Sequence, residues 1–167
     1  MQAPVAQGQT VPLDDLFTAL ATAPRDKAPA IVEKIALEWS KSGSPTMDLL
    51  WRRGQQALAD QDFMQATHHF TALTDHAPQF AAGWHGLATA YFKQDNIGPA
   101  LDALGRTLAL EPRHFLAMEG LMVILEQNNL PDQALRVAKM IQSIHPHHPE
   151  LDKIITRLTT TVGGQST

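Results

Sequence analysis

Histidine is the residue type in this sequence with the clearest potential for chemistry. The chain has 8 histidines among 167 residues, and His145, His147 and His148 lie within one short His-Pro-His-His-Pro segment. Imidazoles this close together could bind zinc or copper if a further ligand joined them. The chain has no cysteine, however, and Glu150 is the only acidic residue beside the segment. We therefore predict a polar turn with solvated histidines and no specific metal site.

The common catalytic motifs are absent from the sequence. It has no glycine-rich phosphate loop, nucleophile elbow, HExxH zinc motif or dinucleotide fingerprint. Acidic residues such as Asp14, Asp15 and Asp132 fall in the first turns of expected helices, where the helix dipole favours a negative charge. These observations predict a protein that is not an enzyme and has no cofactor.

Composition and charge are those of an ordinary globular protein. Hydrophobic residues make up 44% of the chain and charged residues 18%. The formal net charge is −4, and the basic residues are scattered apart from Arg52 and Arg53, which argues against binding to nucleic acid. No apolar run approaches the roughly 20 residues that a membrane-spanning helix needs, so we expect no membrane span.

Residues 1–12 differ in composition from the rest of the chain. They are rich in Gln, Ala, Pro and Gly, and we expect them to be disordered. They lack the basic start and the apolar stretch of a signal peptide. They resemble the mature start of an exported bacterial protein. We therefore expect a periplasmic or secreted location, and a cytoplasmic tail is the alternative.

A fixed repeat period runs through most of the sequence. Residues of the same kind recur at positions one period apart: Ala66, Ala100 and Ala134; Pro78, Pro112 and Pro146; Leu50, Trp84 and Met118; and Ala57, Tyr91 and Leu125. Self-similarity at a fixed period is typical of repeat proteins, in which each unit buries its apolar face against its neighbours.

The repeat resembles the tetratricopeptide repeat (TPR), which has Trp, Leu-Gly and Tyr on a first helix and Ala, Phe and a closing Pro on a second. The middle unit carries the resemblance most fully, with Trp84, Leu87, Ala88, Tyr91, Ala100, Leu104 and Pro112. The first unit has Leu50 and Ala57 in place of Trp and Tyr, and the third has the bulky Met122 at a small-residue position. The resemblance implies an all-α fold, a right-handed solenoid of antiparallel helix pairs.

The period also predicts how the chain is divided. The expected segments are a disordered stretch (1–12), a degenerate TPR-like helical pair (13–46), three clear TPR units (47–80, 81–114 and 115–148), a C-terminal capping helix (149–162) and a free tail (163–167). This division gives nine helices and no β-strand. Shifting the frame back by one period places Leu16, Val32 and Trp39 at repeat-core positions, so the degenerate pair is expected to lead the array.

The first helix of each TPR unit lines the concave side of the array, and this implies a peptide-binding groove. The expected groove residues are Trp51, Arg52, Gln55, His85, Thr89, Phe92, Lys93, Glu119, Val123 and Glu126. Aromatic and charged residues together are typical of peptide-binding surfaces. We expect Trp51, Phe92 and Arg52 to be the anchors. The alternative is that Trp51 and Phe92 pack against neighbouring units.

Some TPR domains bind the EEVD tail of chaperones through a Lys/Asn/Arg clamp. This chain has Trp51 and Gln55 where the clamp has Lys and Asn in its first unit, so a co-chaperone role of that kind is not expected.

The function predicted from the sequence is a non-catalytic adaptor or scaffold that binds a protein or peptide in the concave groove. A structural self-association module is the main alternative, and a metal-handling protein that uses its histidines is a weaker one. The sequence does not name the partner, and it is compatible with a monomer or a weak homo-oligomer.

Overall fold

The computed structural model describes residues 11–165. Residues 1–10, which make up most of the segment expected to be disordered, lie outside the described residues, as do residues 166–167. The described part of the chain is all-α and has no strand. Its nine helices are α1 (Leu13–Thr22), α2 (Ala28–Trp39), α3 (Pro45–Ala59), α4 (Phe63–His76), α5 (Ala81–Lys93), α6 (Ile97–Leu110), α7 (Phe115–Gln127), α8 (Pro131–Ile144) and α9 (Leu151–Gln165). The predicted fold class is therefore confirmed.

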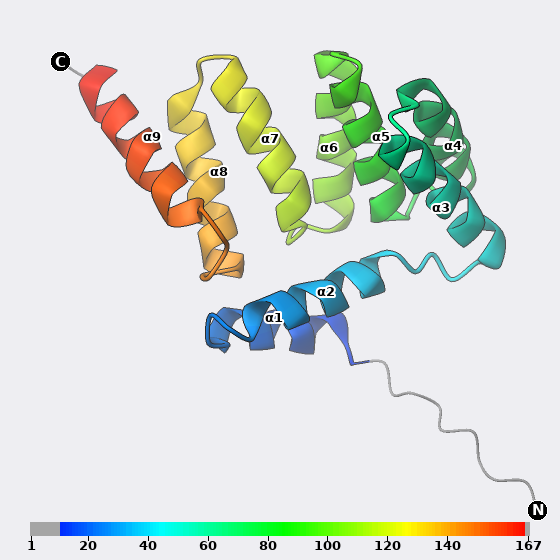
Figure 1. Ribbon diagram of the computed structural model, residues 1–167, viewed down its shortest axis with the longest axis horizontal. Helices are drawn as coiled ribbons and strands as arrows, with labels where there is room; N and C mark the ends of the chain where they lie inside the picture. The colour runs from blue at the N-terminus through cyan, green and yellow to red at the C-terminus, as the bar shows by residue number, and fades with distance from the viewer. Residues whose placement is uncertain (1–10, 166–167) are drawn as a thin grey trace, which may run out of the picture.

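Helices α3 to α9 stand side by side in one row, with each helix antiparallel to the next (Figure 1). The turn inside each unit has the same geometry. Gln61, Asp95 and Asn129 occupy equivalent positions of the three units and have positive φ angles of 60°, 60° and 55°. In each case the next residue donates its backbone N–H to a carbonyl five residues back, at 2.9–3.0 Å. This is the Schellman motif, which satisfies carbonyl groups at a helix end.

Small residues let the helices of the array approach closely. Ala66, Ala100 and Ala134, the recurring alanines of the second helices, are all fully buried. Phe70 of α4 lies between the first helices of two successive units. A Cβ atom added to Gly54 of α3 would lie 2.6 Å from the Phe70 ring, and one added to Gly86 of α5 would overlap it. The distance between α3 and α5 therefore depends on glycine at both places.

Helices α1 and α2 form a hairpin that lies below the row of repeats in Figure 1, across the ends of α7 and α8. Its apolar residues belong to the same buried cluster as residues of α7, α8 and α9: Leu16, Phe17, Leu20 and Ile35 with Met118, Ile141 and Leu158. Arg113 joins the hairpin to the array through a 2.8 Å ion pair with Asp14.

This position differs from the prediction of a degenerate repeat that leads the array. The apolar face of the hairpin is buried on the far end of the row rather than on α3. Residues 40–44, with Gly43 at φ 81°, carry the chain from α2 back to the start of α3 (Figure 1). Val32 and Trp39, which the shifted frame placed in a repeat core, pack instead against the cluster shared with α7 to α9.

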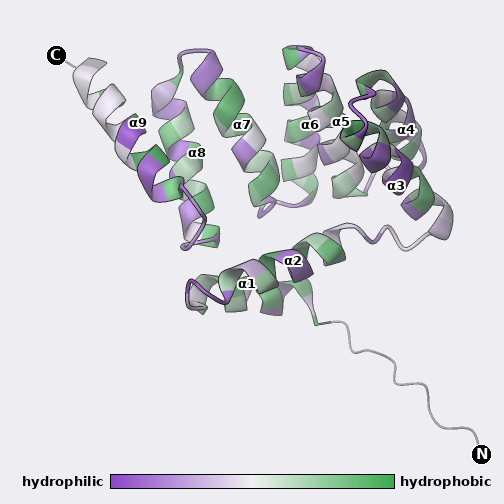
Figure 2. Ribbon diagram, in the orientation of Figure 1, coloured by the Kyte–Doolittle hydropathy of each residue, from purple (hydrophilic) through white to green (hydrophobic). Residues whose placement is uncertain are grey.

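The capping helix is longer than the sequence predicts. Helix α9 runs to Gln165, so residues 163–165 are helical rather than part of a free tail. Glycine costs about 1 kcal/mol relative to alanine in a helix, which is why Gly163 and Gly164 indicated an earlier end. The last turns of α9 are pale in Figure 2, since they are mostly threonine and glycine. Among the described residues, no helix combines the length and apolar character needed to cross a membrane.

The glycines at positions 86 and 120 provide a matched test of the packing. They occupy equivalent positions of successive units, but a Cβ atom at Gly120 would meet Leu104 at an ordinary 3.6 Å. We expect Gly86→Ala to lower the free energy of unfolding by about 1–3 kcal/mol through overlap with Phe70. Gly120→Ala is expected to raise it by about 0.5–1 kcal/mol through helix propensity. Urea unfolding measures both, and the same sign for the two variants would contradict this packing.

Gln61 provides a test of the turn geometry. A left-handed conformation costs an L-residue roughly 1–2 kcal/mol, whereas glycine adopts it freely and asparagine tolerates it. Gln61→Gly should therefore raise the free energy of unfolding by about 1 kcal/mol, measured by thermal or urea unfolding. Asn129→Gly is the control and should have a smaller effect. Equal effects would show that the backbone at Gln61 is not the source of the gain.

Candidate functional site

A cavity of about 320 Å³ lies between the first helices of the second and third units. We call it the α5–α7 cavity. Its lining residues are His85, Ala88, Thr89 and Phe92 of α5, Leu104 of α6, and Leu116, Glu119, Gly120, Val123 and Ile124 of α7. The wall is mostly apolar, with a few polar groups at its edge, and this combination is typical of ligand-binding pockets.

Two differences between successive units contribute to the cavity. Helices α6 and α7 pack less closely than α4 and α5, and the side chain between the first helices is smaller. Phe70 and Leu104 occupy equivalent positions, one repeat period apart. The large Phe70 ring fills the space between α3 and α5 and touches both helices. Leu104 is shorter, and Gly120 beside it carries no side chain to fill the gap. The position that holds an aromatic ring in the first interface therefore contributes to an open pocket in the second.

Trp51 has a different role from its equivalent residue in the next unit. It stands one repeat period before His85, so both belong to the concave face of a first helix. Trp51 is half-buried and packs against the cluster that contains Phe70 and Leu87, while His85 lines the α5–α7 cavity. The indole Nε1 of Trp51 is buried without a hydrogen-bond partner. Trp51 thus packs within the array, which is the alternative that the sequence left open.

The predicted groove residues fall into two groups. Five of them line the α5–α7 cavity together: His85, Thr89, Phe92, Glu119 and Val123. The other five are not among its lining residues: Trp51, Arg52, Gln55, Lys93 and Glu126. Phe92 has a double role, because it lines the cavity and also packs against the buried cluster around Leu104.

The carboxylates on α7 are already paired within the chain. His148 donates a hydrogen bond from Nε2 to Glu119 at 2.9 Å, and this bond raises the pKa of His148 above its usual value. Arg157 of α9 forms a 2.7 Å ion pair with Glu126. Glu119 and Glu126, which the sequence placed among the groove residues, therefore already have partners within the chain. These partners come from α9 and from the loop before it.

His85 is an uncharged part of the cavity wall. Burial lowers its pKa to about 4, and the nearby Glu119 carboxylate offsets part of that shift. The His85 ring also contacts the ring of His114, with centroids 4.7 Å apart. At neutral pH this side of the cavity therefore offers a neutral imidazole and apolar groups.

The histidines of the His-Pro-His-His-Pro segment are not solvated as the sequence suggested. His145 is only 4% exposed, and His148 is half-buried on Glu119. Both pack at the junction of α8, α9 and the hairpin, and the position of the hairpin was not predicted from the sequence. Over residues 11–165, no group of three or more metal-ligating side chains has a geometry that could hold a metal ion.

Several cavity residues were missed by the reasoning from sequence. Ala88, Leu104, Gly120 and Ile124 line the cavity but belong to helix faces that the repeat pattern assigns to packing. A signal was present in the change from Phe70 to Leu104 at equivalent positions. Comparing the volumes of equivalent residues along the repeats would have located the gap.

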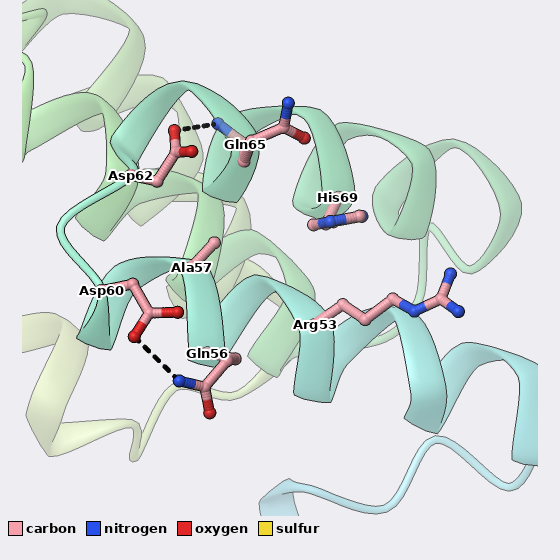
Figure 3. Close-up of a pocket in the computed structure, with 7 residues that line it drawn as sticks. All are labelled: Arg53, Gln56, Ala57, Asp60, Asp62, Gln65 and His69. Atoms are coloured by element: carbon pink, nitrogen blue, oxygen red, sulfur yellow. Dashed lines mark hydrogen bonds between the residues drawn. The ribbon is translucent and has the colours of Figure 1, made fainter.

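A second hollow, of about 440 Å³, lies between α3 and α4. Figure 3 shows its lining side chains, with Arg53 and His69 at one end and the acidic residues at the other. Asp62 accepts a hydrogen bond from the backbone N–H of Gln65, and Asp60 accepts one from Gln56. These carboxylates serve the helix ends, and the hollow lacks the apolar wall of the α5–α7 cavity.

Comparison with known proteins agrees with the repeat architecture. No protein-family model matches the chain. A TPR repeat-containing protein of Rhizobium etli is 28% identical over 156 residues, which cover 93% of this chain and 76% of that protein.

Solved structures show the same fold at low sequence identity. MamA aligns over 90% of this chain and 81% of its own, with a TM-score of 0.65 and 18% identity. The TPR2B domain of yeast Sti1 covers 71% of this chain and 99% of its own, with a TM-score of 0.65 and 15% identity. A TPR protein of Thermus thermophilus aligns over 90% of this chain and 81% of its own, with a TM-score of 0.60 and 18% identity. The repeat register, the stacked helix pairs and these likenesses together show that the chain has the fold of tetratricopeptide repeat proteins and resembles one of them over 93% of its length.

Proposed function

We propose that this protein is a non-catalytic binding module that takes an apolar side chain of a protein or peptide partner into the α5–α7 cavity. TPR domains generally mediate protein–protein interactions. Two of the structural neighbours were solved in complexes, the Sti1 domain in a TPR2B-domain:pHsp70 complex and another neighbour in the CopN–Scc3 complex. The observation that carries the proposal is the cavity itself, which opens on the face formed by the first helices.

The chemistry of the cavity favours an apolar anchor. Its wall includes Phe92, Leu104 and Ile124, and its carboxylate, Glu119, is already paired with His148. At its edge Leu116 is 36% exposed and Val123 is 39% exposed, so apolar surface continues out of the cavity onto α7. An anchor such as leucine or phenylalanine would cover this surface and gain roughly 1.5–3 kcal/mol from its own burial.

Basic side chains that could bind polar groups of a ligand lie on the first helices but outside the cavity lining. Lys93 of α5 and Arg52 of α3 are exposed, and neither forms a hydrogen bond or an ion pair with another described residue. The Asp48 carboxylate lies near Arg52 but is hydrogen-bonded to Ser42. Acidic groups of a ligand could therefore be bound there without breaking an existing pair.

Selection from a random peptide library on the immobilised protein tests the proposal. We expect the enriched peptides to share an apolar anchor residue, and calorimetry with one of them then gives its dissociation constant. Gly120→Leu should weaken binding tenfold or more, because the added side chain enters the cavity. Leu101→Ala, on exposed surface of α6 away from the cavity, is the control and should bind like the parent. Equal affinity of all three proteins would contradict the proposal.

Variants of Trp51 and Phe92 distinguish a role in packing from a role in binding. Trp51→Ala is expected to lower the free energy of unfolding by roughly 2 kcal/mol or more and to leave peptide affinity nearly unchanged, because this side chain packs within the array. Phe92→Ala should weaken peptide binding by about 2 kcal/mol, since an aromatic wall residue is lost. Urea unfolding and calorimetry on both variants measure the two effects. A larger loss of affinity for Trp51→Ala than for Phe92→Ala would place the site on α3 instead.

A further inference from the structure

Stacked rings join the α1–α2 hairpin to the repeat array. The indole of Trp39, at the end of α2, lies parallel to the His114 ring, with centroids 4.0 Å apart and an interplanar angle of 6°. The His114 ring in turn contacts His85. Trp39 also contacts Phe17 of α1 and Phe115 of α7. Two histidines of the array thus lie directly behind the hairpin.

A third histidine faces the hairpin at the other end of the contact. His145 lines a cavity of about 510 Å³ together with Arg25, Ala28, Pro29, Val32 and Glu33 of the hairpin region. Its ring contacts Phe115 and His148, at centroid distances of 5.6 and 5.2 Å. The Nδ1 atom of His145 is buried and has no hydrogen-bond partner. The surface under the hairpin therefore contains imidazoles that water does not reach while the hairpin is docked.

We propose that the α1–α2 hairpin is an acid-sensitive latch, which detaches from the repeat array when the histidines beneath it are protonated, while the repeats stay folded. The inference does not depend on the proposed binding function. It rests on His114 and His145, which are buried where the hairpin meets the array, and on His85, which contacts His114 from the array side.

Protonation of His114 would remove a specific bond as well as place a charge in the contact. In the docked state its Nδ1 accepts a hydrogen bond of 3.2 Å from the backbone N–H of Ala117 and so caps α7. A protonated imidazole has no free lone pair and cannot accept this bond. Burial, together with the neighbouring His85, lowers the pKa of His114 to about 3.

The other two histidines respond in the same direction. Burial lowers the pKa of His85 and of His145 to about 4 in each case. In the detached state the rings of His114 and His145 meet water, and their pKa values return towards the ordinary value of about 6.5. The detached state therefore binds more protons than the docked state between about pH 6.5 and pH 4. By linkage, docking is at full strength above pH 6.5 and is progressively lost as the pH falls through this window.

Other charged groups at the contact modify this response. His148 is held by Glu119, which raises its pKa, so His148 protonates first and its charge disfavours protonation of the docked His145. His147 adds to this effect, while Glu119 partly offsets it. Arg113 also faces the contact, where it is paired with Asp14 of the hairpin and Glu111 of the array.

The distance between the hairpin and the array tests the latch directly. The chain has no cysteine, so Lys34→Cys on α2 and Lys139→Cys on α8 provide two sites for spin labels at exposed positions. We expect a single short distance at pH 7.5 and a long, broad distribution in acid, with a midpoint between pH 6.5 and 4. Amide hydrogen exchange in α5 and α6 should stay protected at that midpoint. An unchanged distance down to pH 4, or loss of protection in α5 and α6 at the same pH, would overturn the proposal.

The number of protons taken up when the hairpin detaches identifies the histidines that are responsible. In the parent protein, detachment of the hairpin should take up more than one proton, as read from the steepness of the pH transition. Replacing one of these histidines should reduce that number of protons by about one. His145→Gln leaves the Trp39–His114 stack intact, and His114→Asn keeps an acceptor for the cap of α7. His76→Asn, on exposed surface at the end of α4, is the control and should behave like the parent. Equal steepness in the parent and in His145→Gln and His114→Asn would contradict the proposal.

Discussion

The structure depends on how closely the first helices of successive units approach one another around a single side chain of the helix between them. In the first interface this side chain is Phe70, and glycine at positions 54 and 86 makes room for it. In the second interface the equivalent residue is Leu104, and a Cβ atom added to Gly120 would lie at ordinary contact distance from it. Helices α6 and α7 also pack less closely than α4 and α5, so the second interface is more open and its smaller central residue does not fill it. The first interface is filled and the second contains the α5–α7 cavity.

The arrangement of the helices could be predicted from the sequence because it is governed by local, repeated signals. The regular spacing of the alanines and prolines predicted the helix pairs. Half of the predicted groove residues line one cavity for the same reason, since residues on the concave face follow the period. The rest could not be read from the period. Trp51 is equivalent to His85 in register, but its role depends on the volume of its neighbours.

Contacts between segments far apart in the sequence account for the remaining differences. Asp14 pairs with Arg113, and Trp39 stacks on His114, although no repeat pattern relates these residues. The hairpin covers the apolar ends of α7 and α8, and in doing so it buries histidines that belong to polar turns by their local sequence. His85 belongs to both regions, because it lines the cavity and touches His114 behind Trp39. A change in hairpin docking therefore reaches one wall of the candidate binding site.

We propose that the α5–α7 cavity of the second interface binds a partner because this interface lacks a side chain like Phe70, which fills the first interface. The most direct measurement is the affinity of a library-selected peptide for the double variant Ala88→Gly with Leu104→Phe, which copies the residues of the first interface into the second. We predict that this variant unfolds at a urea concentration close to that of the parent but binds the peptide at least tenfold more weakly, because the phenylalanine ring occupies the cavity. Unchanged affinity in a variant shown to be folded would contradict the account.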